Sequence, residues 1–315
     1  MLAEALRLTT SQEDIDELTA QLEAELKECE ATTVSYKNKL KQFMMENDIW
    51  QISELNYYWR EKYCEYLKNR MSKTSCELYI KTFDRVKLHS LRKQPQIILA
   101  GKRQRLEYAD EILYLPYHPN IEIAERFCRE NNKNLLAWDF TLIAAEKLKR
   151  QIFQVLHYFI ENAANSERMH AQLGGLARLY DFCILEQIED LEKLEIDQIE
   201  RFQKTFTTEY QRHYYAGVTY WCGRALFMEA EEIHWDANVW YMERMHLQPE
   251  RIDPAAPIMS LSFAEVTNKE NRKLLQKYLR YGIGIANLSI SSLRTEFLVV
   301  RKFLGDMNQP ETENI

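Results

Sequence analysis

Histidine and cysteine, the side chains that most often bind transition metals, are scattered along this sequence. None of the seven histidines lies in an H-E-x-x-H motif or four residues from another histidine, and no two of the six cysteines share C-x-x-C spacing. Zinc sites and disulfide frameworks are typically marked by such patterns. We therefore predict neither a metal nor a cofactor, and we expect the cysteines to be small buried side chains in a reducing cytosol.

Other segments have the composition of a site without its spacing. Glu229–Asp236 (EAEEIHWD) places carboxylates beside His234, but we interpret it as a solvated helix end. The glycines of Leu173–Leu179 (LGGLARL) do not form G-x-G-x-x-G and follow no strand. We expect them to permit a close helix contact or to mark a helix start, rather than to bind phosphate. The aromatic segments His213–Tyr215 and Tyr220–Phe227 fit core packing or a stacking surface.

The strongest chemical signal is a basic block. From Trp59 to Arg105 there are 13 Lys and Arg against 4 Asp and Glu, a local charge of +9 in a chain of net charge −7. This is typical of a phosphate-binding surface, or of a solvated helical face balanced by the acidic segment Ser11–Glu30. For the first case we predict DNA-binding residues in the block and two in the less basic second half. They are Arg70, Lys73, Lys81, Arg85, Lys87, Arg92, Lys93, Arg212 and Arg224.

The elements that must position these residues are helices. The chain has only 8 Gly and 7 Pro, which disfavours turn-rich β architecture. Near the N-terminus an apolar stripe predicts a helix that packs on the body of the protein. It consists of Ile15, Leu18, Leu22 and Leu26. Only Gln96–Ala100 and Glu111–Pro119 are short apolar runs bounded by breakers, and each fits either a strand or a connector. We predict an all-α fold.

An internal repeat organises the predicted helices. When the chain is aligned with itself without a gap so that Leu40 falls on Leu176, nine apolar or aromatic positions coincide, the last being Tyr79 on Tyr215. Each copy then has a helix, a short connector and two further helices, and the connectors read IWQISEL and ILEQIEDL. Because the connector and the helices stay in register, we predict a tandem duplication.

The C-terminal part fits the start of a third unit. An alignment that places Val300 on Leu40 also places Ile315 on Leu55. We therefore interpret Asn287–Met307 as a first helix that is capped by Ser289, ends at Gly305, and folds back or self-associates. The predicted segments are an acidic helix (1–31), a basic helical unit (32–110), a connecting segment (111–165), a second unit (166–247), and a connector with the incomplete third unit (248–315).

These segments resemble the N-terminal region of large tyrosine recombinases of the phage-integrase type. The helix LSISSLRTEFLVVRKFL, a connector, and Y-x-x-Y-L within REKYCEYLKNR are similar to the SAM-like core-binding domain of that family. Four other segments resemble the long N-terminal regions of Gram-positive integrases: LLAWDFTLIAAEKLKRQIFQVL, LARLYDFC, VWYMERMHL and LSFAEVTNKENRKLLQKYLRYGI. The resemblance covers roughly positions 32–307. It implies tandem core-binding helical bundles that grip duplex DNA beside a crossover site during DNA recombination and integration.

The catalytic set of this family is missing from the sequence. The resemblance implies an Arg, a Lys, a His-x-x-Arg pair and a nucleophilic Tyr, with cations that neutralise the scissile phosphate. The segment His89–Arg92 (HSLR) fits the pair literally, but the sequence before it is occupied by the first helical unit and lacks the family's first arginine motif. We expect a phosphate contact or a surface helix end there, and no enzymatic activity.

Two functions from different classes stay open. The first is DNA binding by the non-catalytic part of a recombinase, with the basic unit on the phosphates. The second is a helical interaction module that docks a recombinase or another protein without touching DNA, which the acidic segment Glu186–Glu200 favours. No signal peptide and no apolar run of about 18 residues is present, so we expect a cytoplasmic protein without membrane contact.

Overall fold

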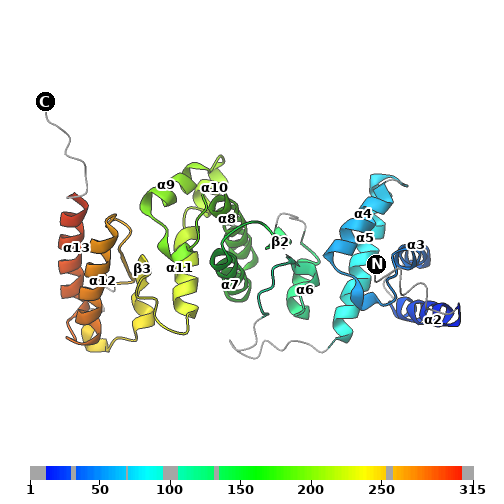
Figure 1. The fold of residues 1–315 in the computed structure, drawn as a ribbon, viewed down its shortest axis with the longest axis horizontal. Coiled ribbons are helices and arrows are strands. Elements are labelled where there is room, and N and C mark those ends of the chain that lie inside the picture. The colour runs from blue at the N-terminus through cyan, green and yellow to red at the C-terminus, as the bar shows by residue number, and fades with distance from the viewer. Residues whose placement is uncertain are drawn as a thin grey trace. The chain divides into compact units, whose positions relative to one another are not determined.

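The chain is mostly helical and divides into two compact units. The computed structural model describes residues 12–29, 33–68, 70–94, 106–130, 135–252 and 258–306 (Figure 1). The units are Met1–Thr141 and Leu142–Ile315. The all-α prediction is confirmed as mainly helical, because only two small two-stranded sheets occur among the described residues. The unit boundary falls inside the segment 111–165 that we predicted as one connector, and Gln96–Ala100 lies outside the described residues.

Unit one is built around α5, its longest helix. The elements up to that helix are α2 (Gln12–Glu28), α3 (Val34–Glu46), η1 (Ile52–Glu54), α4 (Tyr57–Lys68) and α5 (Lys73–Lys93). Their apolar faces form one core that includes Leu22, Phe43, Tyr63 and Phe83. Leu22 and Leu26 of the predicted N-terminal stripe are buried there, which confirms that α2 packs on the body of its unit.

A pair of short strands completes unit one. The remaining elements are β1 (Ile112–Tyr114), η2 (Leu115–Tyr117), α6 (Ile121–Phe127) and β2 (Ala137–Asp139). β1 and β2 are antiparallel, with Leu113 opposite Trp138. The run Glu111–Pro119, which the sequence left open, is therefore a strand followed by a 3-10 turn.

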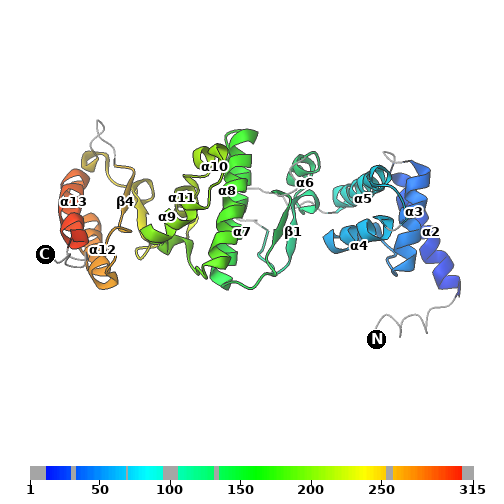
Figure 2. The same cartoon turned by 90° about the horizontal axis from the view of Figure 1, so that it is seen from above.

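Unit two starts with a helical hairpin, and the views of Figures 1 and 2 show its two helices side by side. The elements are α7 (Glu146–Asn162), α8 (Ser166–Leu185), η4 (Leu191–Lys193), α9 (Ile196–Lys204), α10 (Glu209–Tyr214) and α11 (Val218–Glu229). α7 is strongly amphipathic, and its apolar side is buried by α8 and α11. The predicted close helix contact is confirmed, because a Cβ atom on Gly175 would lie 3.1 Å from the Val218 side chain.

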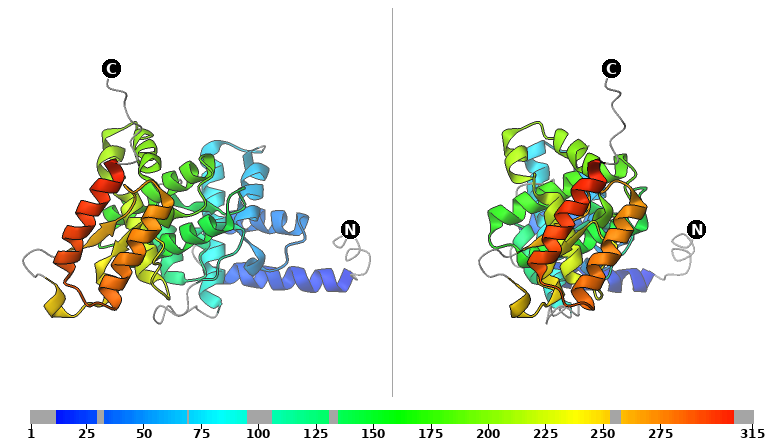
Figure 3. Two further views of the ribbon diagram at one scale, coloured as in Figure 1. Left: turned by 60° about the vertical axis from the view of Figure 1, so that its left-hand side comes forward. Right: turned by 90° about the vertical axis from the view of Figure 1, so that its left-hand side faces the viewer.

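The C-terminal half of unit two repeats the strand pair and adds a second helical hairpin. Its elements are β3 (Val239–Tyr241), η5 (Met242–Met245), η6 (Pro249–Arg251), β4 (Ser260–Ser262), α12 (Lys269–Gly284) and α13 (Ile290–Asp306). β3 and β4 are antiparallel, with Trp240 opposite Leu261. Figure 3 shows α12 in orange beside α13 in red.

The two units share a local structural correspondence, in a register that differs from that of the predicted repeat. An alignment that places Ile52, the start of η1, on Leu191, the start of η4, also places the start of α4 on the start of α9. We call this alignment the Ile52–Leu191 register. In it Asp48 falls on Gln187, and both residues have positive φ, at 56° and 55°. The predicted register would instead match the buried Ile49 to Leu185, yet Leu185 is 80% exposed.

A Schellman turn defines the shared backbone. Ile49 N–H donates to the Met44 carbonyl at 2.9 Å, and Ile188 N–H donates to the Cys183 carbonyl at 2.8 Å. This is the bond that ends a helix after a residue in the left-handed region. The helices before the turn differ in length, with 13 residues in α3 and 20 in α8. Aligning the first residues of α3 and α8 therefore gives a different register from aligning their last residues. The register that we predicted without a gap lies between these two registers.

A second correspondence links the strand pairs and the helices that follow them. An alignment that places the start of β2 on the start of β4 also places the start of α7 on the start of α12. Phe140 N–H donates to the Glu111 carbonyl, and Phe263 N–H donates to the Asn238 carbonyl in the same way. In the sequence, the hairpin α7–α8 follows the strand pair β1–β2. The hairpin α12–α13 follows the strand pair β3–β4 in the same way.

The helix α13, which we interpreted as the start of a third unit, packs within unit two. Ile290, Leu293 and Phe297 are buried in the core of unit two, and the Phe297 ring lies 5.1 Å from the Phe263 ring. The helix folds back on α12, which was one of the two predicted outcomes. Ser289 caps it through its hydroxyl, whereas Gly305 lies inside the helix. The predicted match of Val300 to the buried Leu40 also fails, since Val300 is exposed.

Candidate nucleic-acid interface

The basic block of unit one is organised by α5. Ser72 caps this helix, accepting a hydrogen bond from the Ser75 N–H at 3.4 Å. Burial of Cys76, Phe83 and Val86 holds the inner face against the core of the unit. A helix that is anchored along one side presents the opposite side to solvent over its full length.

Four of the predicted DNA-binding residues share that outer side. They are Lys73, Lys81, Arg85 and Arg92, all of them exposed. At about 100° per residue they fall within roughly a third of the helix circumference. From Lys73 to Arg85 the row rises about 18 Å, a length over which duplex DNA carries about ten phosphate charges. We call these four residues the α5 row.

The first two members of the α5 row form no ion pair with a described residue, although the exposed Glu77 lies one helical turn from each of them. Neither Lys73 nor Lys81 has an ion-pair partner within the described ranges. Arg70 lies just before α5, with its guanidinium 3.8 Å from the centre of the Tyr66 ring. This contact holds the side chain of Arg70 in place without neutralising its charge. Arg70 and Lys73 lie three positions apart in the sequence, and Lys81 lies about 12 Å further along α5.

The C-terminal end of α5 is neutralised by carboxylates of the same unit. Arg92 donates to the Glu125 carboxylate at 2.7 Å, and Lys93 pairs with Glu28. All four side chains are exposed, so each pair contributes only about 0–1 kcal/mol to stability. Such pairs can exchange one partner for a phosphate at small cost, which leaves Arg92 and Lys93 as secondary members of a basic surface.

Lys87 does not belong to any surface. It is 7% exposed, and its ammonium donates to the Ser53 carbonyl at 2.8 Å. Burial lowers the pKa of Lys87 to about 8. Its place among the DNA-binding candidates was wrong because it lies on the inner side of α5, where it supports the connector before α4.

The two members of the H-x-x-R pattern meet different surroundings. The Nε2 atom of His89 is buried without a hydrogen-bond partner, and burial lowers the pKa of its imidazole. Arg92, in contrast, is exposed and paired with Glu125. The two side chains therefore differ in exposure, and the Arg92 guanidinium is engaged by a carboxylate of the same unit.

The two predicted residues of unit two are occupied by local contacts. Arg212 donates to the Phe206 carbonyl at 3.3 Å. Arg224 donates to the Glu243 carboxylate at 2.5 Å and to the Tyr158 hydroxyl at 3.4 Å. Around Arg224 the predicted aromatic segment is mainly core, since Cys222, Leu226 and Phe227 are buried. Unit two therefore lacks a row of cations comparable to that of α5 at these positions.

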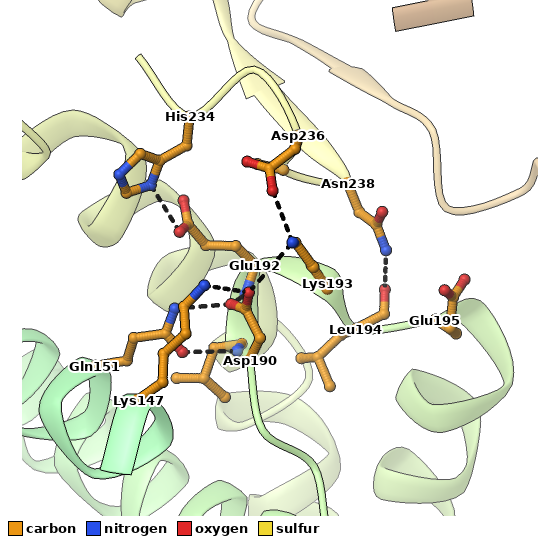
Figure 4. A network of polar contacts seen from close by, with 12 residues as sticks. Lys147, Gln151, Asp190, Glu192, Lys193, Leu194, Glu195, His234, Asp236 and Asn238 are labelled. Carbon is orange, nitrogen blue, oxygen red and sulfur yellow. Dashed lines mark hydrogen bonds and ion pairs between the residues drawn. The ribbon is translucent and has the colours of Figure 1, made fainter. Parts of the chain in front are cut away.

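The most elaborate polar cluster was not predicted at all, and it lies around η4 in unit two (Figure 4). Asp190 accepts from Lys147 at 2.6 Å and from Gln151 at 2.8 Å, and the Gln151 side-chain oxygen accepts from Leu191 N–H at 2.8 Å. Burial favours the neutral acid, but these hydrogen bonds outweigh it and lower the pKa of Asp190. The cluster joins η4 to the first turns of α7.

The same cluster includes two side chains of the segment EAEEIHWD. His234 lies 2.7 Å from one carboxylate oxygen of Glu192, whose side chain is only 6% exposed. Burial outweighs the effect of His234 and raises the pKa of Glu192. Asp236 pairs with Lys193 at 2.6 Å. The segment begins at the last residue of α11, and Glu231, Glu232 and Asp236 are exposed, which confirms a solvated helix end; its contacts with η4 were not predicted. Its partners belong to η4, which is distant in the sequence, so no local pattern signals them.

A buried arginine ties the strands to the cluster. Arg272 donates to the Glu195 carboxylate at 2.5 Å and to the Asn238 side-chain oxygen at 2.8 Å. Asn238 also donates to the Leu194 carbonyl at 2.9 Å. These contacts join η4, α12 and the start of β3, while the second carboxylate oxygen of Glu192 is buried without a hydrogen-bond partner.

Other site chemistries find no support among the described residues. Within them, no three His, Cys, Asp or Glu side chains gather closely enough to hold a metal ion. Four of the six cysteines are buried, and burial raises the pKa of Cys183 to about 12, which keeps its thiol unreactive. None of the described helices combines the length and the apolar character required to cross a bilayer.

Comparisons with protein-family models, with curated proteins and with solved structures find no match to this chain.

Proposed function

We propose that unit one binds duplex DNA through the α5 row and Arg70. The observation that carries this proposal is that Lys73 and Lys81 are exposed and form no ion pair with the described residues, on one side of a long, well-anchored helix. Cations in such a row suit the evenly charged backbone of a duplex, and the binding they provide depends little on base sequence. Arg92 and Lys93 would extend the contact when phosphates replace their carboxylate partners.

We further propose that the chain serves as a non-catalytic DNA-gripping part of a tyrosine recombinase. The sequence resemblance to core-binding regions supports this, as does the repeated helix–turn–helix segment in both units. On this proposal the chain neither cleaves nor joins DNA. A covalent protein–DNA adduct on a nicked substrate, lost when one tyrosine is replaced by Phe, would contradict it.

The competing proposal is a helical interaction module without DNA binding. A specific observation favours it: in unit two the predicted cations Arg212 and Arg224 are engaged by protein groups. The two proposals differ in where a charge reversal acts. DNA binding requires the α5 row, whereas protein docking does not.

The decisive experiment reverses the exposed charges and leaves Lys87 in place. The variant Lys73→Glu, Lys81→Glu, Arg85→Glu is compared with a control of equal charge change in unit two. That control is Lys269→Glu, Lys277→Glu, Lys302→Glu, all at exposed positions. Binding to a short fluorescent duplex, longer than the α5 row, is measured by anisotropy at several salt concentrations, and circular dichroism verifies the fold.

We expect strongly salt-dependent binding in the parent. Each lost phosphate contact lowers the slope of log K against log salt by about 0.9, so the α5 variant should lose close to three units of slope. The control should retain most of the slope. If the α5 variant binds with the parent's affinity and slope, the interface is not on α5, and the interaction module becomes the better proposal.

A further inference from the structure

The second hairpin of unit two exposes an unusual number of large apolar side chains. On α12 they recur four, three and four positions apart, and on α13 they occupy the C-terminal half. They include Leu274, Tyr278, Tyr281 and Ile285 on α12 and just after it, and Val299, Val300 and Phe303 on α13. Leu274, Val299 and Phe303 are each more than 60% exposed. We call these seven side chains the α12–α13 surface.

Two contacts make this surface continuous. The Tyr278 hydroxyl donates to the Glu296 carboxylate at 2.5 Å, and a Cβ atom on Gly282 would lie 2.6 Å from the Leu293 side chain. The helices therefore run antiparallel and close together, as all views show (Figure 3). One turn beyond the Tyr278–Glu296 contact, helical geometry places Val300 and Phe303 beside Leu274.

The equivalent side of the first hairpin is covered. In the alignment that places α12 on α7, Leu274 and Tyr278 occupy the positions of Gln151 and Val155, which are both buried. Gln151 is covered by η4 through its bond from Leu191 N–H, and α11 packs on both α7 and α8. The fold of this protein thus uses that side of a hairpin to receive another helical segment.

The same holds for the second helix of each hairpin. Ser289 and Asn165 cap α13 and α8, so the two helices can be aligned by their caps. In this alignment Val300 and Phe303 match Leu176 and Leu179, both of which are fully buried. At Leu274, Tyr278, Val300 and Phe303 the exposure is therefore a difference between the two hairpins, whereas Tyr281 and Ile285 match the partly exposed Tyr158 and the exposed Asn162.

Charge at the edges of the surface indicates the chemistry of the occupant. Six lysines and arginines are exposed on the described part of α12 and α13, against two glutamates. At about 100° per residue, Lys277 borders the apolar row of α12 and Lys302 borders that of α13, on opposite edges. Neither has an ion-pair partner among the residues that the structure describes. A second copy would bring these positive edges together, which opposes self-association.

We propose that the α12–α13 surface binds an acidic amphipathic helix of a partner protein. The apolar stripe of that helix would lie between α12 and α13, and its flanking carboxylates would meet Lys277 and Lys302. This is a helix-in-groove mode of recognition, read through residues at i, i+3, i+4 and i+7. It is independent of the DNA-binding proposal, because the α5 row belongs to the other unit.

Two designed peptides, each long enough for about five helical turns, serve as probes. Both carry leucines at i, i+3, i+4 and i+7, and their polar positions are all Glu in one and mainly Lys in the other. Fluorescence anisotropy measures their binding to the full chain. The surface variant is Leu274→Ser with Phe303→Ser. The matched control is Ile143→Ser with Leu185→Ser, which removes two apolar side chains that are 98% and 80% exposed in the same unit.

We expect the acidic peptide to bind at least about tenfold more tightly than the basic one, and the surface variant to lose at least about tenfold in affinity. The control should bind as the parent does. The pair Lys277→Glu with Lys302→Glu should abolish the preference for the acidic peptide. Absence of binding, equal affinity for both peptides, or unchanged binding by the surface variant would overturn the proposal. So would a concentration-dependent dimer that the surface variant abolishes, because a second copy would then be the occupant.

Discussion

The connectors Met44–Asn56 of unit one and Cys183–Glu195 of unit two have the same backbone and different side-chain support. Each leaves its helix by a Schellman turn, passes one residue with positive φ, and forms one turn of 3-10 helix. The two connectors therefore need hydrogen-bond partners for the same backbone groups, but different residues provide these partners in each unit.

One requirement is a partner for the first N–H group of the 3-10 turn. In unit one, Ile52 N–H donates to the Glu25 carboxylate at 3.0 Å. In unit two, Leu191 N–H at the equivalent position donates to the Gln151 amide oxygen at 2.8 Å. Both partners come from the helix before the Schellman helix, α2 or α7. A buried donor at this position must be satisfied, and either side chain satisfies it.

The other requirement is a donor for the carbonyl of the next residue. The Ser53 carbonyl accepts from the Lys87 ammonium, and the Glu192 carbonyl accepts from Asn238 N–H. Unit one thus supports its connector with two ionisable side chains, whereas unit two uses a neutral amide and a backbone N–H. The connector geometry is therefore common to both units, while its dependence on pH is particular to each.

The largest effect should come from the position that decides the register. Ile188 is buried and Leu185 is exposed, although the predicted register would place Leu185 at the buried position. Ile188→Asp buries an unpaired charge and should cost about 3 kcal/mol or more in the free energy of unfolding. Leu185→Asp should cost less than about 0.5 kcal/mol. Urea unfolding measures both, and equal costs would contradict the Ile52–Leu191 register.

Exchanging the donor partners between units should have unequal effects. In the parent protein the Asp190 carboxylate accepts a hydrogen bond from the Gln151 amide at 2.8 Å. The substitution Gln151→Glu replaces this donor with a second carboxylate. We expect a loss of about 2 kcal/mol at pH 7 that shrinks as pH falls below 5, because one of two close carboxylates then becomes protonated.

The reciprocal change Glu25→Gln keeps the acceptor oxygen and adds no charge. It should lower the free energy of unfolding by less than about 1 kcal/mol, as measured by urea unfolding. If both changes cost the same, the surroundings of the two connectors are electrostatically alike and the contrast between them fails.

Lys87 predicts a pH dependence that only unit one has. Its folded pKa of about 8 lies below the ordinary value of 10.5. From pH 8 to 10.5 the unfolded chain therefore binds more protons than the folded one, so stability rises with pH in this window. Relative to Lys87→Met, the parent should gain about 2 kcal/mol between pH 7.5 and 9.5.

Hydrogen exchange of α5 amides, with parent and variant compared at the same pH, isolates the effect of Lys87 from other titrating groups. The control Lys81→Met removes an exposed lysine from the same helix and should leave the difference flat across the window. A flat difference for Lys87→Met as well would mean that the ammonium is not desolvated.

The smallest effect concerns the core residue that follows each connector. Tyr63 and Phe202 are equivalent in the Ile52–Leu191 register and both are buried, but the Tyr63 hydroxyl has no hydrogen-bond partner. Tyr63→Phe removes an unsatisfied polar group, so stability should stay constant or increase by up to about 1 kcal/mol. Thermal unfolding tests this. A clear loss of stability would reveal a partner for the hydroxyl and weaken the equivalence.

Much of the architecture follows from local sequence. The helical stripes, the short run Ile112–Tyr114 and the close contact at Gly175 were predictable because burial with a period of about 3.6 residues, β-rich runs between breakers, and missing side chains are local signals. A correspondence between the two connectors was also predictable from the sequence. The register of this correspondence was not predictable. The helix α8 is longer than α3, and the addition of whole helical turns does not change the period of the apolar residues.

The candidate site divides in the same way. Sequence alone establishes that unit one carries a basic helix with a row of cations. Which cations face solvent depends on the folded chain: Lys87 turns inward to the connector, while Lys73 and Lys81 stay exposed. Folding also brings Glu192 to His234 and buries one side of α13 in the core of unit two. Charge and periodicity are properties of a segment, whereas the burial of a side chain depends on segments that are distant in sequence and contribute the atoms that cover it.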